Sequence, residues 1–149
     1  MTFLSIKVLA RLLLLCNVAW DALSAAAIWW SFCKRDVSDD MECDISAVEG
    51  GVPQMIAGMH TSMWTRRMDA SNHAACMLMA WWVITLGCLR LLAYCYHEEW
   101  MALAVLSYGL EGCAFCIEGL KSTMIPKKAC PAALFSLFCL LICWASMQV

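Results

Sequence analysis

The sequence is poor in histidine and contains no cluster of basic residues, and each shortage excludes a class of function. Its ten lysines and arginines stand alone or in adjacent pairs, and the formal net charge is -2, so nucleic acid is not an expected partner. Histidine occurs three times, each time at or outside the ends of the long apolar segments: His60, His73 and His97. The pair of histidines that would hold a haem inside a membrane is therefore missing.

Catalytic motifs are also lacking. The sequence has no nucleophile motif, no phosphate-binding loop and no carboxylate–histidine cluster of the di-iron type. Most of its eleven cysteines lie in apolar segments, where a thiol acts as a small apolar group. Cys113 and Cys116 have the spacing of a redox motif, but no strand precedes them and no basic neighbour would stabilise a thiolate. We expect a non-enzyme without metal or cofactor, apart from structural lipids.

The chain is rich in long apolar segments. Hydrophobic residues make up 63% of it, and the mean hydropathy is +0.71. A helix needs about 20 mostly apolar residues to cross about 30 Å of hydrocarbon. Four segments qualify, although the last is slightly short: 12–32, 74–96, 100–120 and 131–147. We expect an all-α integral membrane protein, a four-helix bundle that forms a single membrane domain over residues 1–149.

The only sizeable hydrophilic region, 33–73, changes character halfway. Residues 34–44 are acidic and without period, which indicates a solvated loop. After Pro53, a residue favoured at the first helical position, apolar side chains recur at helical spacing and predict a short amphipathic helix over about 53–67. Its key residues are Met55, Ile56, Met59, Met63, Trp64, Arg66 and Arg67. This helix lies at the membrane interface or packs on the protein's own membrane domain, and the pattern fits both.

Charge asymmetry predicts the orientation. Short connections over 97–99 and 121–130 make adjacent spans antiparallel, so both termini lie on one side. That side carries Lys7 and Arg11, whereas the other carries Lys34, Arg35, Arg66, Arg67, Lys121, Lys127 and Lys128. The positive-inside rule then places both longer loops in the cytosol, matrix or stroma and both termini opposite. The first span is longer than a secretory signal's apolar region and has no clear cleavage site, so we expect an uncleaved signal anchor.

Ionisable residues inside the spans are the candidate functional residues, because each costs a few kcal/mol near the bilayer centre. Asp21 shares a helix face with two polar residues, Asn17 and Ser24, and a second polar stripe on 100–120 contains Ser107, Glu111 and Glu118. Asp21 lies 11 residues (32 minus 21) and Glu111 9 residues (120 minus 111) from the loop side, so their depths differ by about 3 Å. Arg90, the only base inside a span, either reaches inward to Glu111 or extends toward the 97–99 turn.

These residues fit three hypotheses. The first is an internal polar network that fixes helix packing. The second is a polar face that binds a partner membrane protein, and the third is a relay of protons or ions. The relay is the least favoured, because the chain has neither the broken helices nor the internal repeats of transporters. Small residues over 109–119, including a Gly112-x-x-x-Cys116 pattern, favour close helix contact.

Residues from about 80 to 131 resemble the ergosterol biosynthetic protein 28 family. Trp82 stands eight residues before Arg90, a short polar turn leads to an aromatic-rich helix that ends near Glu118, and Thr123 and a proline-containing loop follow. The family has a histidine one turn before the glutamate, where this chain has Ala114. The resemblance implies a four-span protein of the endoplasmic reticulum that tethers sterol-biosynthesis enzymes without catalysis, with Arg90, Glu118 and Thr123 as its matching positions.

Taken together, the residues and the resemblance predict a non-catalytic scaffold that binds other integral membrane proteins and lipids in a hetero-oligomeric complex. The alternative is a structural accessory subunit of a large energy-converting complex, such as a respiratory complex, ATP synthase or photosystem. That protein would lie in a mitochondrial or plastid inner membrane. A small proton or solute transporter that uses Asp21 and Glu111 is the third hypothesis.

Overall fold

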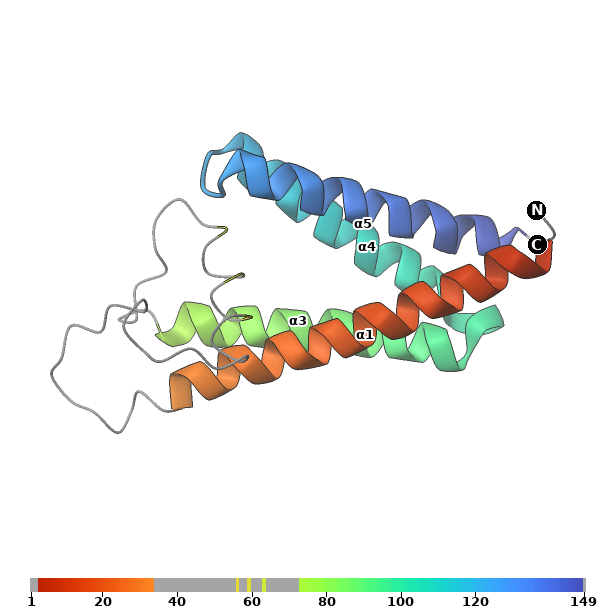
Figure 1. The fold of residues 1–149 in the computed structure, drawn as a ribbon, viewed down its shortest axis with the longest axis horizontal. Coiled ribbons are helices and arrows are strands. Elements are labelled where there is room, and N and C mark those ends of the chain that lie inside the picture. The colour runs from red at the N-terminus through yellow and green to blue at the C-terminus, as the bar shows by residue number, and fades with distance from the viewer. Residues whose placement is uncertain (1–2, 34–55, 57–58, 60–62, 64–72, 149) are drawn as a thin grey trace, which may run out of the picture.

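The protein folds into four long helices in a computed structural model that describes residues 3–33, 56, 59, 63 and 73–148. These are α1 (Phe3–Cys33), α3 (His73–Cys95), α4 (His97–Leu120) and α5 (Pro126–Met147), as Figure 1 shows. Each contains a stretch long and apolar enough to cross a membrane. The expected all-α, four-helix membrane fold is confirmed. The predicted acidic loop over 34–44 lies outside the described residues.

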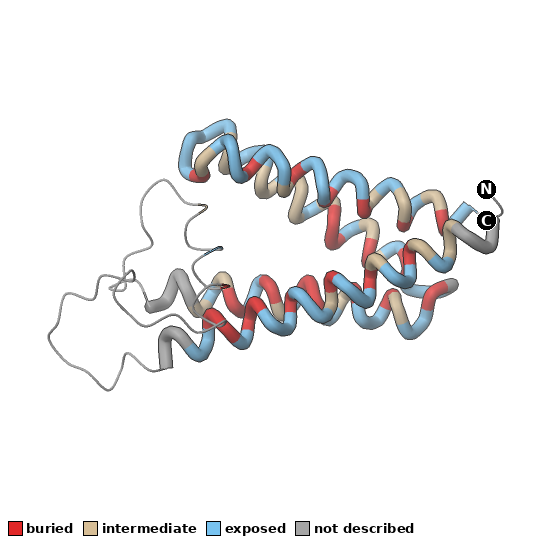
Figure 2. Tube along the Cα trace, in the orientation of Figure 1, coloured by how far each residue is buried: buried red, intermediate tan, exposed pale blue. Residues whose placement is uncertain are grey.

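The outer faces of the helices are apolar, as a lipid environment requires. In each span, only 22–33% of the most apolar stretch of 18 residues is buried inside the protein. The mean hydropathy of the spans is 1.5 to 2.0. Figure 2 shows that buried positions lie where helices face one another and exposed positions lie on the outside. Large side chains such as Leu78, Leu120 and Leu134 are therefore exposed, which suits hydrocarbon and would disfavour water.

The helices form two pairs, with α1 along α3 and α4 along α5. The pairs meet at the end that holds both termini and the α3–α4 junction, and they diverge toward the opposite end (Figure 1). At the closed end a cluster of buried residues joins all four helices, including Leu14 of α1, Ala93 of α3, Tyr108 of α4 and Cys139 of α5. The bundle is therefore a wedge that opens toward the end where α4 connects to α5.

Several helix ends differ from the predicted spans, and α1 begins at Phe3 rather than at residue 12. The α3–α4 connection is a single non-helical residue, Tyr96, so the predicted 97–99 turn forms the first turn of α4 instead. The carbonyl of Tyr96 accepts the N–H of Trp100 at 3.0 Å, which starts the new helix directly. The fourth span is not short, because α5 begins at Pro126 and contains Pro131. Pro126 stands in the first turn, where a missing N–H breaks no helical hydrogen bond.

Part of the predicted amphipathic segment packs on the membrane domain. The structure describes three of its residues, Ile56, Met59 and Met63, and the others lie outside the described residues: Met55, Trp64, Arg66 and Arg67. Ile56 is buried in a cluster with Ile28 and Ala80. The carbonyl of Met63 accepts the N–H of Ile125 at 2.7 Å. At these points the segment contacts the bundle, as one of the two predicted placements requires.

Candidate functional site

The centre of the site is Arg90, on the face of α3 that points into the bundle. Its side chain is 1% exposed and forms two ion pairs, one with Asp21 Oδ2 at 2.8 Å and one with Glu111 Oε2 at 2.5 Å. Sequence spacing predicts that the depths of the two carboxylates differ by only about 3 Å, and it allows Arg90 two directions. In the structure Arg90 reaches inward and lies between the two acids.

Further contacts extend this ion-pair network to all four helices. Arg90 Nε donates to the hydroxyl of Ser107 at 3.3 Å, and the hydroxyl of Ser136 donates to Glu111 Oε2 at 3.1 Å. The guanidinium carbon of Arg90 lies 4.2 Å from the ring centroid of Tyr108, the geometry of a cation–π contact. Since Asp21 is on α1, Arg90 on α3, Ser107, Tyr108 and Glu111 on α4 and Ser136 on α5, one network links every helix.

A glycine allows α1 to approach α3 closely beside this network. A Cβ on Gly87 would lie 3.1 Å from Cβ of Asp21 and 3.6 Å from its Oδ2. Those distances are tight for a carbon side chain, so any larger residue would push Asp21 aside. Gly87 stands three residues before Arg90 and so on the same side of α3. Its lack of a side chain helps to hold Asp21 within reach of Arg90.

Other predicted site residues lie apart from this network. The side-chain amide of Asn17 donates to the carbonyl of Leu13 at 2.8 Å, one turn earlier in α1. Ser24 is fully buried, and its hydroxyl has no hydrogen-bond partner within the described part of the chain. The hydroxyl of Thr123 donates to both the carbonyl and the carboxylate of Glu118. That pair closes the carboxyl end of α4 and makes no hydrogen bond to Arg90.

Sequence reasoning missed three contributors: Gly87, Tyr108 and Ser136. Ser136 stands among apolar neighbours on α5, so no polar stripe marked it. Tyr108 belongs to the aromatic residues common in membrane helices, and its stacking under Arg90 depends on how α3 and α4 cross. The glycine pattern could have indicated Gly87 as a contact point, but not which residue it approaches.

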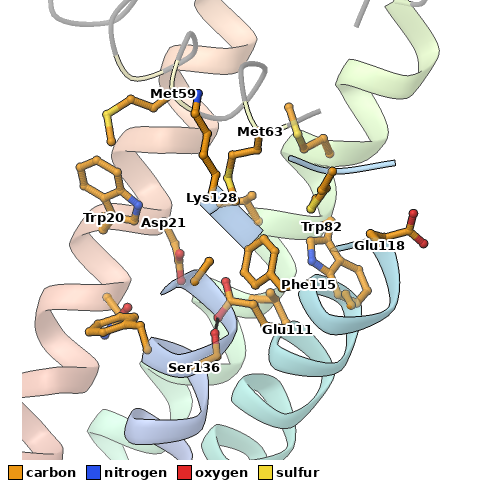
Figure 3. Close-up of a pocket in the computed structure, with 18 of the residues that line it drawn as sticks. Trp20, Asp21, Met59, Met63, Trp82, Glu111, Phe115, Glu118, Lys128 and Ser136 are labelled. Carbon is orange, nitrogen blue, oxygen red and sulfur yellow. Dashed lines mark hydrogen bonds between the residues drawn. The ribbon is translucent and has the colours of Figure 1, made fainter. Parts of the chain in front are cut away.

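A cavity of about 940 Å³ lies above the network, between the diverging helix pairs. Asp21, Arg90, Glu111 and Ser136 line its base, and Glu118, Lys127 and Lys128 line the end near the loops, as Figure 3 shows for most of them. Its walls are apolar and aromatic: Trp20, Trp82, Val83, Leu86, Phe115 and Phe135. Met59 and Met63 from the 33–73 region also line it. The cavity thus combines a hydrocarbon-like body with a charged base.

A second, shallower groove of about 550 Å³ lies on α4 and α5. The residues of its floor are small: Gly109, Gly112, Cys113, Cys116 and Gly119. Exposed leucines of α5, among them Leu134 and Leu137, form its rim. We call this surface the α4/α5 groove.

Fold and site together define a small polytopic membrane protein whose helices are joined by an intramembrane ion-pair network. Comparisons of the chain with family models, with curated proteins and with solved structures found no match. The resemblance to the sterol-scaffold family therefore remains a prediction. Within the described residues, no group of three or more histidine, cysteine or acidic side chains is arranged to hold a metal ion.

Proposed function

We propose that this protein is a non-catalytic membrane scaffold or accessory protein that binds other integral membrane proteins. The observation that supports it most is the α4/α5 groove. Glycine and other small side chains allow the backbones of two membrane helices to come close, which maximises van der Waals contact where no hydrophobic effect acts between helices. The occupant we assign to the groove is a transmembrane helix of a partner protein.

The small residues of α4 divide between internal packing and this outer surface. A Cβ on Gly119 would lie 3.2 Å from Cβ of Ala129, and one on Gly112 would lie 3.4 Å from Cβ of Ser136, so these two positions serve the contact with α5. Cys113 and Cys116, by contrast, are exposed. Because their thiol side chains are small, Cys113 and Cys116 project less than the leucines of the rim. A partner helix can therefore lie in the groove, against α4.

The ion-pair network supports a structural role over a relay. Asp21 and Glu111 share one cationic partner, Arg90, and hydrogen bonds of Ser107 and Ser136 extend the network to all four helices. A network that bridges every helix favours one fixed arrangement of the bundle, which suits a packing role. In this proposal the protein binds a partner through its apolar faces and small residues. It transfers no charge through the bundle.

Two partner classes follow from this proposal. The resemblance over 80–131 favours sterol-biosynthesis enzymes of the endoplasmic reticulum, above all those of C-4 demethylation. The alternative is a large energy-converting complex of a mitochondrial or plastid inner membrane, in which this chain would be one accessory subunit. Both use the same groove, so the identity and size of the complex distinguish them.

Site-specific photocrosslinking in the native membrane tests the proposal. A benzophenone amino acid replaces Leu137, on the rim of the groove, and in a matched control it replaces Phe138, which is equally exposed on α5 but lines neither the groove nor the cavity. We expect a discrete adduct with one membrane protein at position 137 and none at 138, and its loss in a Cys116→Trp background. Mass spectrometry then assigns the partner to one of the two classes.

Native electrophoresis completes the test. A sterol scaffold would migrate with its enzymes, and a subunit of an energy-converting complex would migrate in a species of several hundred kilodaltons. Equal adducts at positions 137 and 138, or migration of the native protein at a few tens of kilodaltons, would contradict the proposal.

A further inference from the structure

The cavity between the helix pairs has the composition of a ligand site. Its volume of about 940 Å³ lies near the top of the range of about 300–1,000 Å³ that small-molecule sites occupy. Such sites have mostly apolar walls and a few convergent polar groups, and here the polar groups converge at the base. Because the spans lie in hydrocarbon, a molecule that fills the cavity must match an apolar wall along its length and a charged base at its end.

The base carries more negative than positive charge. Asp21 and Glu111 are two acids, and Arg90 is the one base that they share. Each carboxylate uses one oxygen for Arg90, Oδ2 in Asp21 and Oε2 in Glu111. Hydrogen bonds to their second oxygens are absent among the described residues, and both side chains line the cavity. With both acids ionised, the base therefore has one negative charge in excess and two oxygens ready to accept.

An excess charge in a medium of low dielectric constant is costly unless a counter-charge lies near it. A cation within the cavity would supply that charge. The walls favour the same occupant, because the faces of tryptophan rings attract cations and Trp20 and Trp82 both line the cavity. Figure 3 shows the carboxyl groups of Asp21 and Glu111 between Trp20 on one side and Trp82 on the other.

We propose that this cavity binds an amphipathic amine. Its protonated amine would donate to Asp21 and Glu111 at the base, and its hydrocarbon body would lie along the aromatic walls. This site is independent of the α4/α5 groove and of any partner protein. It would make the chain a binding protein for a small lipid-like cation in addition to its scaffolding role.

The lysines at the other end of the cavity do not change this assignment. Lys128 lies eight residues before Ser136 on α5 (136 minus 128), which is about 12 Å along the helix and beyond hydrogen-bond reach of the base. An anionic lipid could place its headgroup at Lys127 and Lys128, but the end of its apolar chain would then abut Arg90 and both acids. That arrangement buries charge against hydrocarbon and leaves the excess charge unbalanced.

Isothermal titration of the purified full chain in a neutral detergent tests the proposal. The probes are dodecylamine and dodecanol, which share a hydrocarbon body and differ in charge, and 3-aminocholestane and cholesterol as a polycyclic pair. We expect an amine of at least one pair to bind in a 1:1 ratio about tenfold or more tightly than its alcohol. The pair whose amine binds more tightly then shows whether the hydrocarbon part of the natural ligand is a single chain or polycyclic.

Two variants and their controls locate the site. Ala132→Trp places a ring inside the cavity and should abolish binding, whereas Leu141→Trp, on the exposed face of the same helix, should not. Glu111→Gln should weaken the amine about tenfold and the alcohol little, whereas Glu99→Gln, exposed at the other end of α4, should change neither.

Three results would overturn the proposal: equal affinity for an amine and its alcohol in both pairs, amine binding that survives Ala132→Trp, or binding of oleate without binding of an amine. Should Glu111→Gln fail to fold, the amine-to-alcohol ratio of the native chain and the Ala132→Trp variant still decide the matter. Failure here would leave the photocrosslinking at position 137 unaffected, so the two proposals fail separately.

Discussion

Replacing Arg90 with methionine tests whether the ion-pair network holds the bundle together. Methionine keeps much of the apolar volume of the side chain but removes the cation that Asp21 and Glu111 share. The two acids are 8% and 22% exposed, so they would remain largely buried without a counter-charge. Removing one member of a buried ion pair typically costs about 3–5 kcal/mol, and the lost contact with Tyr108 adds about 0.5–2 kcal/mol. We expect a loss of at least about 3 kcal/mol.

A neutral version of the network provides the decisive comparison. The triple variant Asp21→Asn, Arg90→Met, Glu111→Gln removes all three charges together. Replacing a whole buried charge network is often neutral or stabilising, because the desolvation cost disappears along with the attraction. The triple variant should therefore recover most of the stability that Arg90→Met loses.

The measurement is the free energy of unfolding from equilibrium denaturation in mixed detergent micelles, followed by circular dichroism. Leu91→Met is the control, since Leu91 is the exposed neighbour of Arg90 on α3. The reasoning would be refuted if Arg90→Met cost less than about 1 kcal/mol relative to Leu91→Met, or if the triple variant were less stable than Arg90→Met alone.

Two further predictions concern helix contact and orientation. Gly87→Val should cost about 1–3 kcal/mol in the same unfolding assay, because a Cβ there would lie 3.1 Å from Cβ of Asp21. Gly109→Ala should cost less, since its Cβ would meet only the side chain of Leu140 at an ordinary 3.5 Å; equal losses would contradict the close α1–α3 contact. Glycosylation acceptor tags in the endoplasmic reticulum should be modified after residue 149 but not within 121–125, because the positive-inside rule predicts that the basic loops stay on the cytosolic side. The reverse pattern would overturn the predicted orientation.

Residue counting predicts that Asp21 and Glu111 lie at nearly one depth. In the structure they both contact Arg90. Depth follows from the rise per residue, which is the same for every helix. The direction of Arg90 could not be derived in this way, because a long side chain near a helix end reaches water or a partner with similar ease. Only the arrangement of α1 and α4 around α3 decided it.

The helix ends show a second limit of sequence reasoning. Hydropathy predicts that the fourth span starts at Pro131, yet α5 begins five residues earlier, at Pro126 (131 minus 126). A proline near the amino end of a helix removes few hydrogen bonds, so hydropathy alone misplaces that end. The polar run over 97–99 likewise predicts the α3–α4 turn slightly late, because His97 is buried and helical in the structure and the turn is at Tyr96.

By itself, the sequence determined that the chain crosses a membrane, how many helices do so and which of their residues carry charge. These properties depend on local composition and on the length of apolar runs, and the bilayer selects for them segment by segment. Tertiary structure alone decided that Arg90 joins α1 to α4, that Gly87 leaves room for the side chain of Asp21 and that the helix pairs diverge around a cavity. Those features depend on the rotation and crossing of helices relative to one another, which arise from contacts between residues far apart in the chain.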